Sequence, residues 1–239
     1  MSLTAAIIQA RMGSTRLPGK SIMDISGKPL VWHVVNRVKR AESIDGVILA
    51  IPEETESIHI VQAVRNLGIP ILIVPGDPND LLGRYNYAAQ MFGIDTVVRV
   101  PADNPCVDPR EIDRIVATYN DLVKPLDRYL LSNLDRNILD NGYPGGLGAE
   151  VYDAGFIRWL HNNVVEVELR EHPHKWAVVH NRMMTIECPG KFRRPELRFD
   201  VNTIDDLEYI RSIYNGVYET KPDFHAADII EFLDNRRLN

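Results

Sequence analysis

A short segment near the start of the chain concentrates residues that can bind phosphate. Residues 9–20 read QARMGSTRLPGK and include three cationic residues, two glycines and two hydroxyl residues. Glycine lets backbone N–H groups approach phosphate oxygens, arginine can bind them with two parallel hydrogen bonds, and lysine supplies a compact positive charge. The spacing matches neither a Walker loop nor a GxGxxG turn, and a solvated basic loop could have the same composition. We favour a triphosphate site.

A carboxylate follows an apolar run much later in the sequence. Asp103 lies in the segment PADNP at residues 101–105, directly after the run at 96–100. An aspartate is a hard oxygen donor, which can bind Mg²⁺ together with phosphate oxygens. An aspartate before Asn-Pro is also a common turn former that accepts backbone hydrogen bonds. The residues alone leave both roles of Asp103 open.

Strands and helices alternate through the first half of the chain and would position both segments. Apolar periodicity, prolines and glycines predict strands at residues 4–8, 47–50, 71–74 and 96–100, and helices at 29–40, 58–67, 81–92 and from 108 onward. This alternation predicts an α/β fold with a mostly parallel sheet and helices on both faces. Ligands in such sheets bind beyond the carboxyl ends of the strands, where residues 9–20 and Asp103 would lie.

The alternation is lost after about residue 120. Glycines and a proline crowd residues 135–148, which predicts an irregular loop over a site. Beyond it we expect a helix at 154–163, strands at 183–187 and 197–201, and two amphipathic helices at the C-terminal end. A single α/β domain can bury one core at this length, so we expect one domain over residues 1–239.

Composition indicates a small-molecule partner. Lys and Arg total 27 against 33 Asp and Glu, the formal net charge is −6, and no basic block suggests a nucleic-acid or anionic-membrane surface. The two cysteines, Cys106 and Cys188, provide neither a disulfide framework nor paired metal ligands, which fits a reducing cytoplasm. The first apolar run ends at Gln9, too early for a signal peptide or a membrane span. We therefore expect a cytoplasmic protein.

The stretch IIQARMGSTRLPGK, at residues 7–20, resembles the signature loop of the sugar-acid cytidylyltransferases. This family is related to spore-coat polysaccharide biosynthesis proteins and to CMP-ulosonate synthetases, which act on 3-deoxy-manno-octulosonate or acylneuraminate. The resemblance implies a Rossmann-like nucleotidyltransferase fold, in which this loop wraps the CTP phosphates and the backbone near Ala10 contacts cytosine. Carried onto this chain, it predicts that the loop's nucleotide-binding residues are Gln9, Ala10, Arg11, Gly13, Ser14, Arg16 and Lys20.

The same resemblance implies a magnesium site. In the family, a turn that reads Gly-Asp-Cys-Pro or similar provides a metal-binding aspartate, and Asp103 matches it. Residues 197–214, LRFDVNTIDDLEYIRSIY, resemble the family's last strand and helix, where a second aspartate binds metal. Asn202 replaces that aspartate and Asp200 lies two residues earlier, so either could be the second ligand, or both could only cap the helix. Thr203 is the expected N-cap of that helix, with Asp206 at the capping-box position.

Three further segments resemble parts of the family pocket. Residues 75–85 match a segment near the nucleotide, which implies roles for Asp80 and Arg84, although a helix cap and a surface arginine are equally good explanations. Residues 143–150, YPGGLGAE, resemble an acceptor loop that reads YPRGLDVE, so Gly145 and Gly148 imply an altered acceptor. Residues 170–172 match an Arg-Glu-His step near the sugar and the dimer partner. The predicted acceptor-binding residues are Tyr143, Gly146, Glu150, Arg170, Glu171 and His172.

The resemblance therefore predicts a Mg²⁺-dependent cytidylyltransferase of polysaccharide biosynthesis. It would transfer CMP from CTP to an acidic sugar, either 3-deoxy-manno-octulosonate or a sialic-acid-like sugar, and release pyrophosphate. Lys20, Arg11 and Asp103 would carry catalysis, and residues of about 135–195 would form an acceptor and dimerisation subregion of a homodimer. Two alternatives remain open: transfer to a neutral sugar or phosphosugar, and a nucleotide-binding protein that has lost catalysis.

Overall fold

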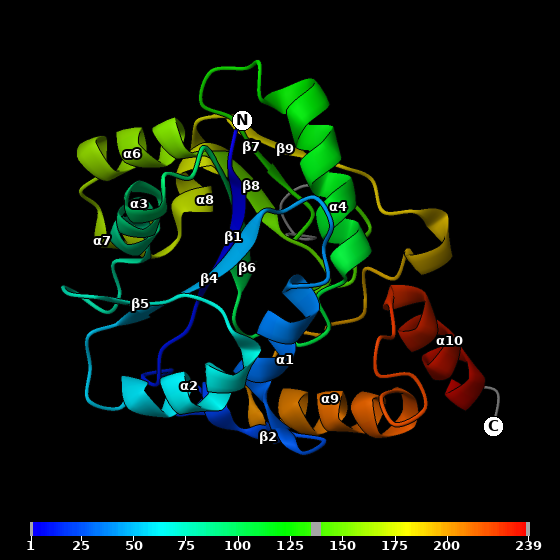
Figure 1. Ribbon diagram of the computed structural model, residues 1–239. Coiled ribbons are helices and arrows are strands. Elements are labelled where there is room, and N and C mark those ends of the chain that lie inside the picture. Colours follow the sequence, from blue (N-terminus) through cyan, green and yellow to red (C-terminus); the bar gives the residue numbers. More distant parts are fainter. Residues whose placement is uncertain (1, 135–139, 238–239) are drawn as a thin grey trace.

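The fold is described from a computed structural model, which describes residues 2–134 and 140–237. A seven-stranded sheet crosses the molecule in the order β5-β4-β1-β6-β8-β7-β9 (Figure 1). Its strands are β1 Thr4–Gln9, β4 Gly46–Pro52, β5 Ile71–Val74, β6 Thr96–Pro101, β7 Leu130–Ser132, β8 Glu150–Asp153 and β9 Met183–Thr185. The first four of these are mutually parallel, which confirms the expected parallel sheet.

Two short strands were not expected and make the sheet mixed. β8 runs antiparallel to both β6 and β7, while β7 and β9 are parallel. The two unexpected strands are β7, with three residues, and β8, with four. Strands of this length are too short for apolar periodicity to reveal them. A separate two-stranded hairpin, β2 Asp24–Ile25 and β3 Lys28–Pro29, precedes the first helix.

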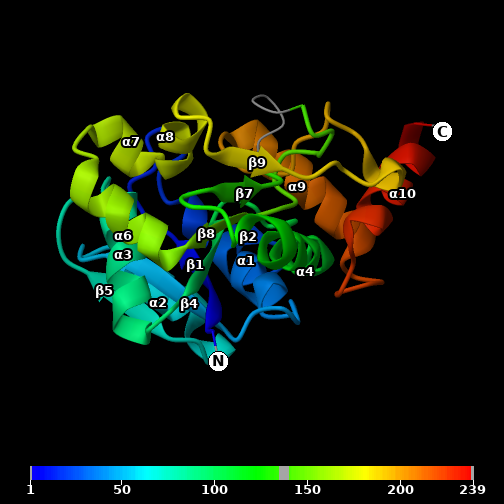
Figure 2. The same cartoon turned by 90° about the horizontal axis from the view of Figure 1, so that it is seen from above.

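Helices cover both faces of the sheet, as predicted (Figure 2). On one face, α1 Leu30–Val38, α2 Ser57–Val64, α4 Pro109–Thr118, α9 Ile204–Val217 and α10 Ala226–Arg237 contribute to the larger core. On the other face, α3 Leu81–Phe92, α6 Ala154–Asn163, α7 Val167–Glu171 and α8 Pro173–Val179 pack around the smaller core. None of the described helices is long and apolar enough to cross a membrane.

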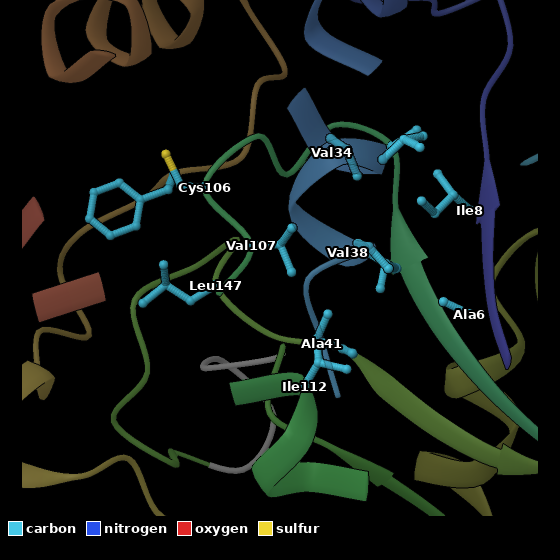
Figure 3. Close-up of a cluster of buried hydrophobic side chains, with 14 of the residues drawn as sticks. Ala6, Ile8, Val34, Val38, Ala41, Cys106, Val107, Ile112 and Leu147 are labelled. Carbon is cyan, nitrogen blue, oxygen red and sulfur yellow. The ribbon is translucent and has the colours of Figure 1, made fainter. Parts of the chain in front are cut away.

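Strand β1 contributes to both cores because its side chains alternate between the faces. Ala6 and Ile8 are buried in the larger core, where Figure 3 shows them near Val34 and Val38 of α1. Ala5 and Ile7 are buried in the smaller core. A near-continuous apolar run is typical of a strand covered on both faces.

The helix boundaries follow the predicted signals. Asp80 caps α3 by accepting a hydrogen bond from the Gly83 N–H at 2.9 Å, and the helix ends at Gly93 in the left-handed conformation. Thr203 and Asp206 form the expected capping box at the start of α9. The helix expected at residues 154–163 is also confirmed.

The strand expected at residues 197–201 was a wrong prediction. This segment forms only one isolated bridge, between Gly145 and Arg198. Its backbone bonds to loops instead: Phe199 N–H donates to Gly145 O at 2.8 Å and Val201 N–H donates to Asp103 O at 2.9 Å. Part of the loop expected at 135–148 lies outside the described residues, and residues 140–148 form no regular helix or strand.

Candidate active site

A cavity, which we call the first cavity, lies beyond the carboxyl ends of β1 and β6. It has a volume of about 350 Å³ and draws its wall from the 9–20 segment, the start of α3, the end of β6 and the end of α7. Its lining residues are Gln9, Ala10, Arg11, Ser14, Thr15, Arg16, Lys20, Ser21, Leu81, Arg84, Tyr85, Arg99, Pro101, Ala102, Asp103, Glu171 and His172. Five of them are Arg or Lys and two are Asp or Glu, so the wall has an excess of positive charge.

The 9–20 segment folds back on itself, which brings its cations to one place. The Ser14 and Gly19 N–H groups both donate to Met12 O, at 3.0 and 2.9 Å. Gly19 has φ +72°, a left-handed conformation that favours glycine. The hydroxyl of Ser21 donates to Arg11 O at 3.0 Å. This turn returns the chain toward the end of β6, where Lys20 meets Asp103.

Lys20 is at the centre of the charged contacts in the first cavity. Its Nζ lies 2.7 Å from Asp103 Oδ2 and donates to Val201 O at 2.7 Å and Asn202 Oδ1 at 3.4 Å. Arg16 Nη2 donates to the same Asn202 oxygen at 2.7 Å. The structure thus brings Asp103 and Asn202 to Lys20, although they lie 83 and 182 positions away from it in the sequence.

The side chains of Asn202 and Asp200 face different neighbours. The Asn202 amide oxygen faces Arg16 and Lys20, while its Nδ2 donates to Asp200 Oδ2 at 2.5 Å. Asp200 also accepts two hydrogen bonds from Arg198, at 3.0 and 2.6 Å. Asp200 is therefore engaged by Arg198 and Asn202, whereas the Asn202 oxygen shares Lys20 with Asp103 and with the Val201 carbonyl.

The Asp103 and Asn202 oxygens could supply two of the ligands of a magnesium ion. The Asp103 carboxylate and the Asn202 amide oxygen converge on one ammonium group, and both are hard donors of the kind that Mg²⁺ prefers. Among the described residues, no group of three or more His, Cys, Asp or Glu could hold a metal ion. Mg²⁺ commonly keeps few protein ligands and completes its shell with phosphate oxygens and water, which suits a site with two donors.

The remaining nucleotide-site candidates lie around the N-terminal end of α3. Arg11 pairs with Glu171 at 2.9 Å and also donates to Asn79 Oδ1. Gln9 donates to Leu81 O at 2.8 Å and accepts from Arg84 Nε at 3.2 Å. Burial lowers the pKa of Arg84, which still leaves the group cationic at neutral pH.

Two predicted nucleotide residues are not in the first cavity's wall. Gly13 lies in the loop without lining the cavity. Asp80 caps α3 and pairs with Arg170 through two hydrogen bonds of 3.1 and 2.8 Å. The geometry of Asp80 thus matches the helix-cap explanation, and Arg170 holds that cap in place.

The second cavity adjoins the first and shares three residues with it. Its volume is about 270 Å³, and its lining residues are Arg99, Pro101, Asp103, Asn104, Leu134, Gly145, Gly146, Glu150, His174, Arg198 and Asp200. Arg99, Pro101 and Asp103 line both cavities. A ligand in each cavity would therefore meet the other near Asp103.

The predicted acceptor residues separate in the structure. Gly146 and Glu150 line the second cavity, whereas Glu171 and His172 line the first. Tyr143 is buried and donates to Glu111 Oε2 at 2.5 Å, so its hydroxyl faces neither cavity. Burial, aided by Lys175, lowers the pKa of His172, which favours the neutral form of this ring.

Arg99 is a site residue that the sequence analysis missed. Its Nη1 lies 3.0 Å from Glu150 Oε1 and its Nε donates to the Tyr85 hydroxyl at 3.0 Å. Burial lowers the pKa of Arg99, but the Glu150 carboxylate together with the Tyr85 and Tyr152 hydroxyls outweighs burial and raises this pKa. A lone cation inside the apolar strand TVVRVP was the signal that could have revealed it, because a buried arginine is rarely unpaired.

Sequence comparison places these residues in a known family. A family model described as Cytidylyltransferase matches residues 5–143, which is more than half of the chain. The chain is 26% identical over 233 residues to the spore coat polysaccharide biosynthesis protein SpsF of Bacillus subtilis (strain 168), covering 95% of this chain and 92% of that protein. It is 36% identical over 118 residues to a 3-deoxy-manno-octulosonate cytidylyltransferase of Nitratidesulfovibrio vulgaris (strain DP4), covering 48% of this chain and 45% of that protein.

Solved structures show the same fold. A cytidylyltransferase from Leptospira borgpetersenii aligns with a TM-score of 0.86 at 24% identity, covering 99% of this chain and 96% of that one. A CMP:2-keto-3-deoxy-manno-octonic acid synthetase complexed with CTP aligns with a TM-score of 0.68 at 18% identity, covering 90% and 99%. A manganese complex of Rv0371C from Mycobacterium tuberculosis H37Rv aligns with a TM-score of 0.56 at 15% identity, covering 89% and 99%.

Proposed function

This chain belongs to the cytidylyltransferase family, related to SpsF and to 3-deoxy-manno-octulosonate cytidylyltransferases, and we propose that it transfers CMP from CTP to an acidic sugar. The observation that carries the proposal is the contact of Lys20 with Asp103 at the junction of the two cavities. The excess of cationic side chains in the first cavity suits a triphosphate, and the adjoining second cavity offers a place for the acceptor.

In the proposed reaction, the acceptor hydroxyl attacks the α-phosphorus of CTP from the second cavity. A bond forms between the acceptor oxygen and the α-phosphorus, the bond from that phosphorus to the oxygen that bridges to the β-phosphorus breaks, and pyrophosphate leaves with the electron pair. The hydroxyl proton is released to water. Lys20, Arg11 and Arg16 bind the departing phosphates and stabilise their growing negative charge. Such a transfer depends mainly on positioning and charge, so it needs no nucleophilic side chain.

Asp103 and Asn202 are the residues that we propose to hold Mg²⁺. When bound, the ion supplies a positive charge that offsets the charge of the phosphate oxygens. Lys20, which contacts Asp103 in this structure, would then bind those phosphate oxygens. The named manganese complex supports a divalent ion in this fold, although it concerns a different protein.

The acceptor is proposed from the named relatives. Several of them are described as 3-deoxy-manno-octulosonate cytidylyltransferases, and one as an 8-amino-3,8-dideoxy-manno-octulosonate cytidylyltransferase. A neutral sugar or phosphosugar is the second candidate, because Gly145 brings no side chain to the second cavity and Gly148 has none either.

A homodimer is also part of the proposal. The segment from 164 to 180 exposes three valines, Val165, Val167 and Val179, each more than two-thirds accessible. Contiguous exposed apolar patches are typical of interaction surfaces, and we propose that these valines contribute to such a patch in the dimer.

A pyrophosphate-release screen tests the proposed function. It crosses CTP, UTP, ATP and GTP with a panel of sugar acids, neutral sugars and sugar phosphates, each with Mg²⁺. Pyrophosphate with CTP and a sugar acid is the expected result. Release only with neutral sugars or phosphosugars would support the second candidate, and no release with any pair would leave a nucleotide-binding protein without catalysis.

A further inference from the structure

The loop at residues 145–146 packs directly against the segment at 197–200. Gly145 N–H donates to Leu197 O at 3.0 Å, and Phe199 N–H donates back to Gly145 O at 2.8 Å. Gly146 has φ +89°, and a Cβ atom there would lie 2.7 Å from the carbonyl carbon of Phe199. The loop therefore presents only backbone to this part of the second cavity, and a neighbouring residue must supply any charged side chain.

Arg198 is that neighbour. It bridges to Gly145 through the backbone, lines the second cavity and leaves 51% of its side chain accessible. Asp200 fixes the guanidinium through two hydrogen bonds, from Nε at 3.0 Å and from Nη2 at 2.6 Å. Within the described residues Nη1 of Arg198 has no hydrogen-bond partner. Asp200 thus fixes one edge of the Arg198 guanidinium, and Nη1 can still donate hydrogen bonds to a ligand.

Arg99 presents a similar group from another wall of the same cavity. Glu150 and Tyr85 engage its Nη1 and Nε atoms, and its Nη2 has no hydrogen-bond partner in the part of the chain that the structure describes. A guanidinium has five N–H donors and no acceptor. The second cavity therefore contains two oriented guanidinium groups, each with unused donors.

The balance of charged side chains in the second cavity indicates which kind of anion this cavity can bind. Among the described residues that line this cavity, three are carboxylates and each has a cationic partner: Asp103 with Lys20, Glu150 with Arg99, and Asp200 with Arg198. The described part of this wall lacks the excess of positive charge that a dianionic phosphate needs, in contrast to the first cavity. A single carboxylate carries one charge and can accept several N–H bonds from arginine.

We propose that Arg198 and Arg99 bind the carboxylate of the acceptor sugar in the second cavity, and that Arg198 is the residue that selects acidic acceptors. The proposal rests on the proposed function, because it assumes that the second cavity receives the acceptor. It makes Arg198 a specificity-determining residue and sets sugar acids apart from neutral sugars and from phosphosugars.

The test compares steady-state kinetics of the wild type, Arg198→Ala and Arg198→Lys. The probes are CTP with 3-deoxy-manno-octulosonate, or the best sugar acid of the screen, and the methyl ester of the same sugar acid. Arg198→Ala should raise the acceptor KM roughly tenfold or more, on the scale of a lost hydrogen bond to a charged group. The CTP KM should change by less than about twofold, and Arg198→Lys should recover only part of the loss, because lysine lacks the planar fork.

Discrimination between the acid and its ester gives a second readout. The wild type should prefer the acid, and Arg198→Ala should lose most of that preference, which a merely structural role would not produce. Arg211→Ala is the matched control, since Arg211 also pairs with a nearby carboxylate but lies on α9 outside both cavities. Thermal melts with and without CTP show whether each variant folds and binds the donor.

One result would overturn the proposal while the proposed function stands, and two others would overturn both. If the wild type turns over sugar acids but Arg198→Ala keeps the acceptor KM and the preference for the acid, Arg198 does not bind the carboxylate. If the wild type uses only neutral sugars or phosphosugars, the second cavity has no carboxylate to bind. If the wild type releases no pyrophosphate at all, the proposed function fails as well.

Discussion

The first and second cavities adjoin each other but are built in opposite ways. The first takes seven of its lining residues from one continuous segment at 9–20, plus Ser21, and its cations outnumber its carboxylates. The second takes its wall from short pieces scattered between residues 99 and 200, and each carboxylate among its described lining residues is paired with a cation. A triphosphate needs a local excess of charge, whereas selection among sugars needs a few oriented groups from several directions.

The two cavities meet at Asp103, where we propose that the CMP group is transferred. Asp103 follows β6, its backbone carbonyl accepts from Val201 N–H, and its carboxylate contacts Lys20. One residue thus ties the charged loop to the segment that carries Asp200 and Asn202. Variants on the two sides of Asp103 should affect donor and acceptor parameters differently, and the predictions below test this division.

Among the residues of the 9–20 segment, the largest effect is expected at Lys20. Lys20→Ala removes the ammonium group that faces the leaving phosphates, so kcat/KM should fall about a hundredfold or more, as for other lost charge-stabilising groups. Initial rates of pyrophosphate release over a range of CTP concentrations measure this. Lys221→Ala is the control, because Lys221 pairs with Asp228 on the surface and lines neither cavity. Near-normal activity of Lys20→Ala would mean that the first cavity does not bind the triphosphate.

The next effect concerns the metal and separates Asn202 from Asp200. Asn202→Ala should lower the rate about ten- to a hundredfold at limiting Mg²⁺, because the amide oxygen beside Lys20 and Asp103 is lost. Asp200→Asn should change the Mg²⁺ dependence less, since Asp200 is engaged by Arg198 and by the Asn202 amide. The measurement is initial rate against Mg²⁺ concentration at saturating CTP.

Two further variants complete that experiment. Asp103→Asn should abolish turnover, because a neutral amide cannot offset the ion's charge as a carboxylate does. Asn202→Asp should tighten Mg²⁺ binding by adding a carboxylate. A stronger loss of Mg²⁺ response in Asp200→Asn than in Asn202→Ala would make Asp200 the working ligand instead.

The same contrast explains how much the sequence could predict. The parallel strands, most helix ends and the cations of the first cavity were predictable, because apolar periodicity, caps and a charged loop are local features. The sequence did not indicate β7, β8 or the irregular course of residues 197–201, since short strands and loop pairing depend on distant partners. Arg99 and Arg198 were missed for the same reason. Arg99 pairs with Glu150, and Arg198 lies beside Gly145, and both of these partners are distant in the sequence.

A smaller effect is expected from nucleotide choice. CTP with Mg²⁺ should raise the melting temperature more than ATP or GTP, because a ligand that binds only the folded state stabilises it, by about 2.7 kcal/mol at a hundred times its Kd. Thermal melts at matched nucleotide concentrations measure the shifts. Equal shifts from all four nucleotides would indicate that the first cavity recognises phosphates without selecting cytosine.

The smallest effect is expected at the start of α9, which holds Asn202 beside Arg16 and Lys20. Thr203→Ala removes the side chain that accepts from Asp206 N–H, and loss of such a cap costs about 1 kcal/mol. For a chain of this length that corresponds to a fall in melting temperature of about 2–4 °C. Asp153→Ala is the matched control, because Asp153 caps α6 in the same way by accepting from Phe156 N–H and lines neither cavity.

The two cap variants should differ in catalysis rather than in stability. Asp206 also accepts from the Asn202 N–H at 2.9 Å, so a loosened capping box should disturb Asn202 and raise the Mg²⁺ concentration needed for half-maximal rate by a few-fold. Asp153→Ala should leave that concentration unchanged, since α6 packs on the smaller core away from Lys20. If both variants melt earlier by similar amounts and neither changes the Mg²⁺ response, the start of α9 stabilises the fold without positioning the metal ligand.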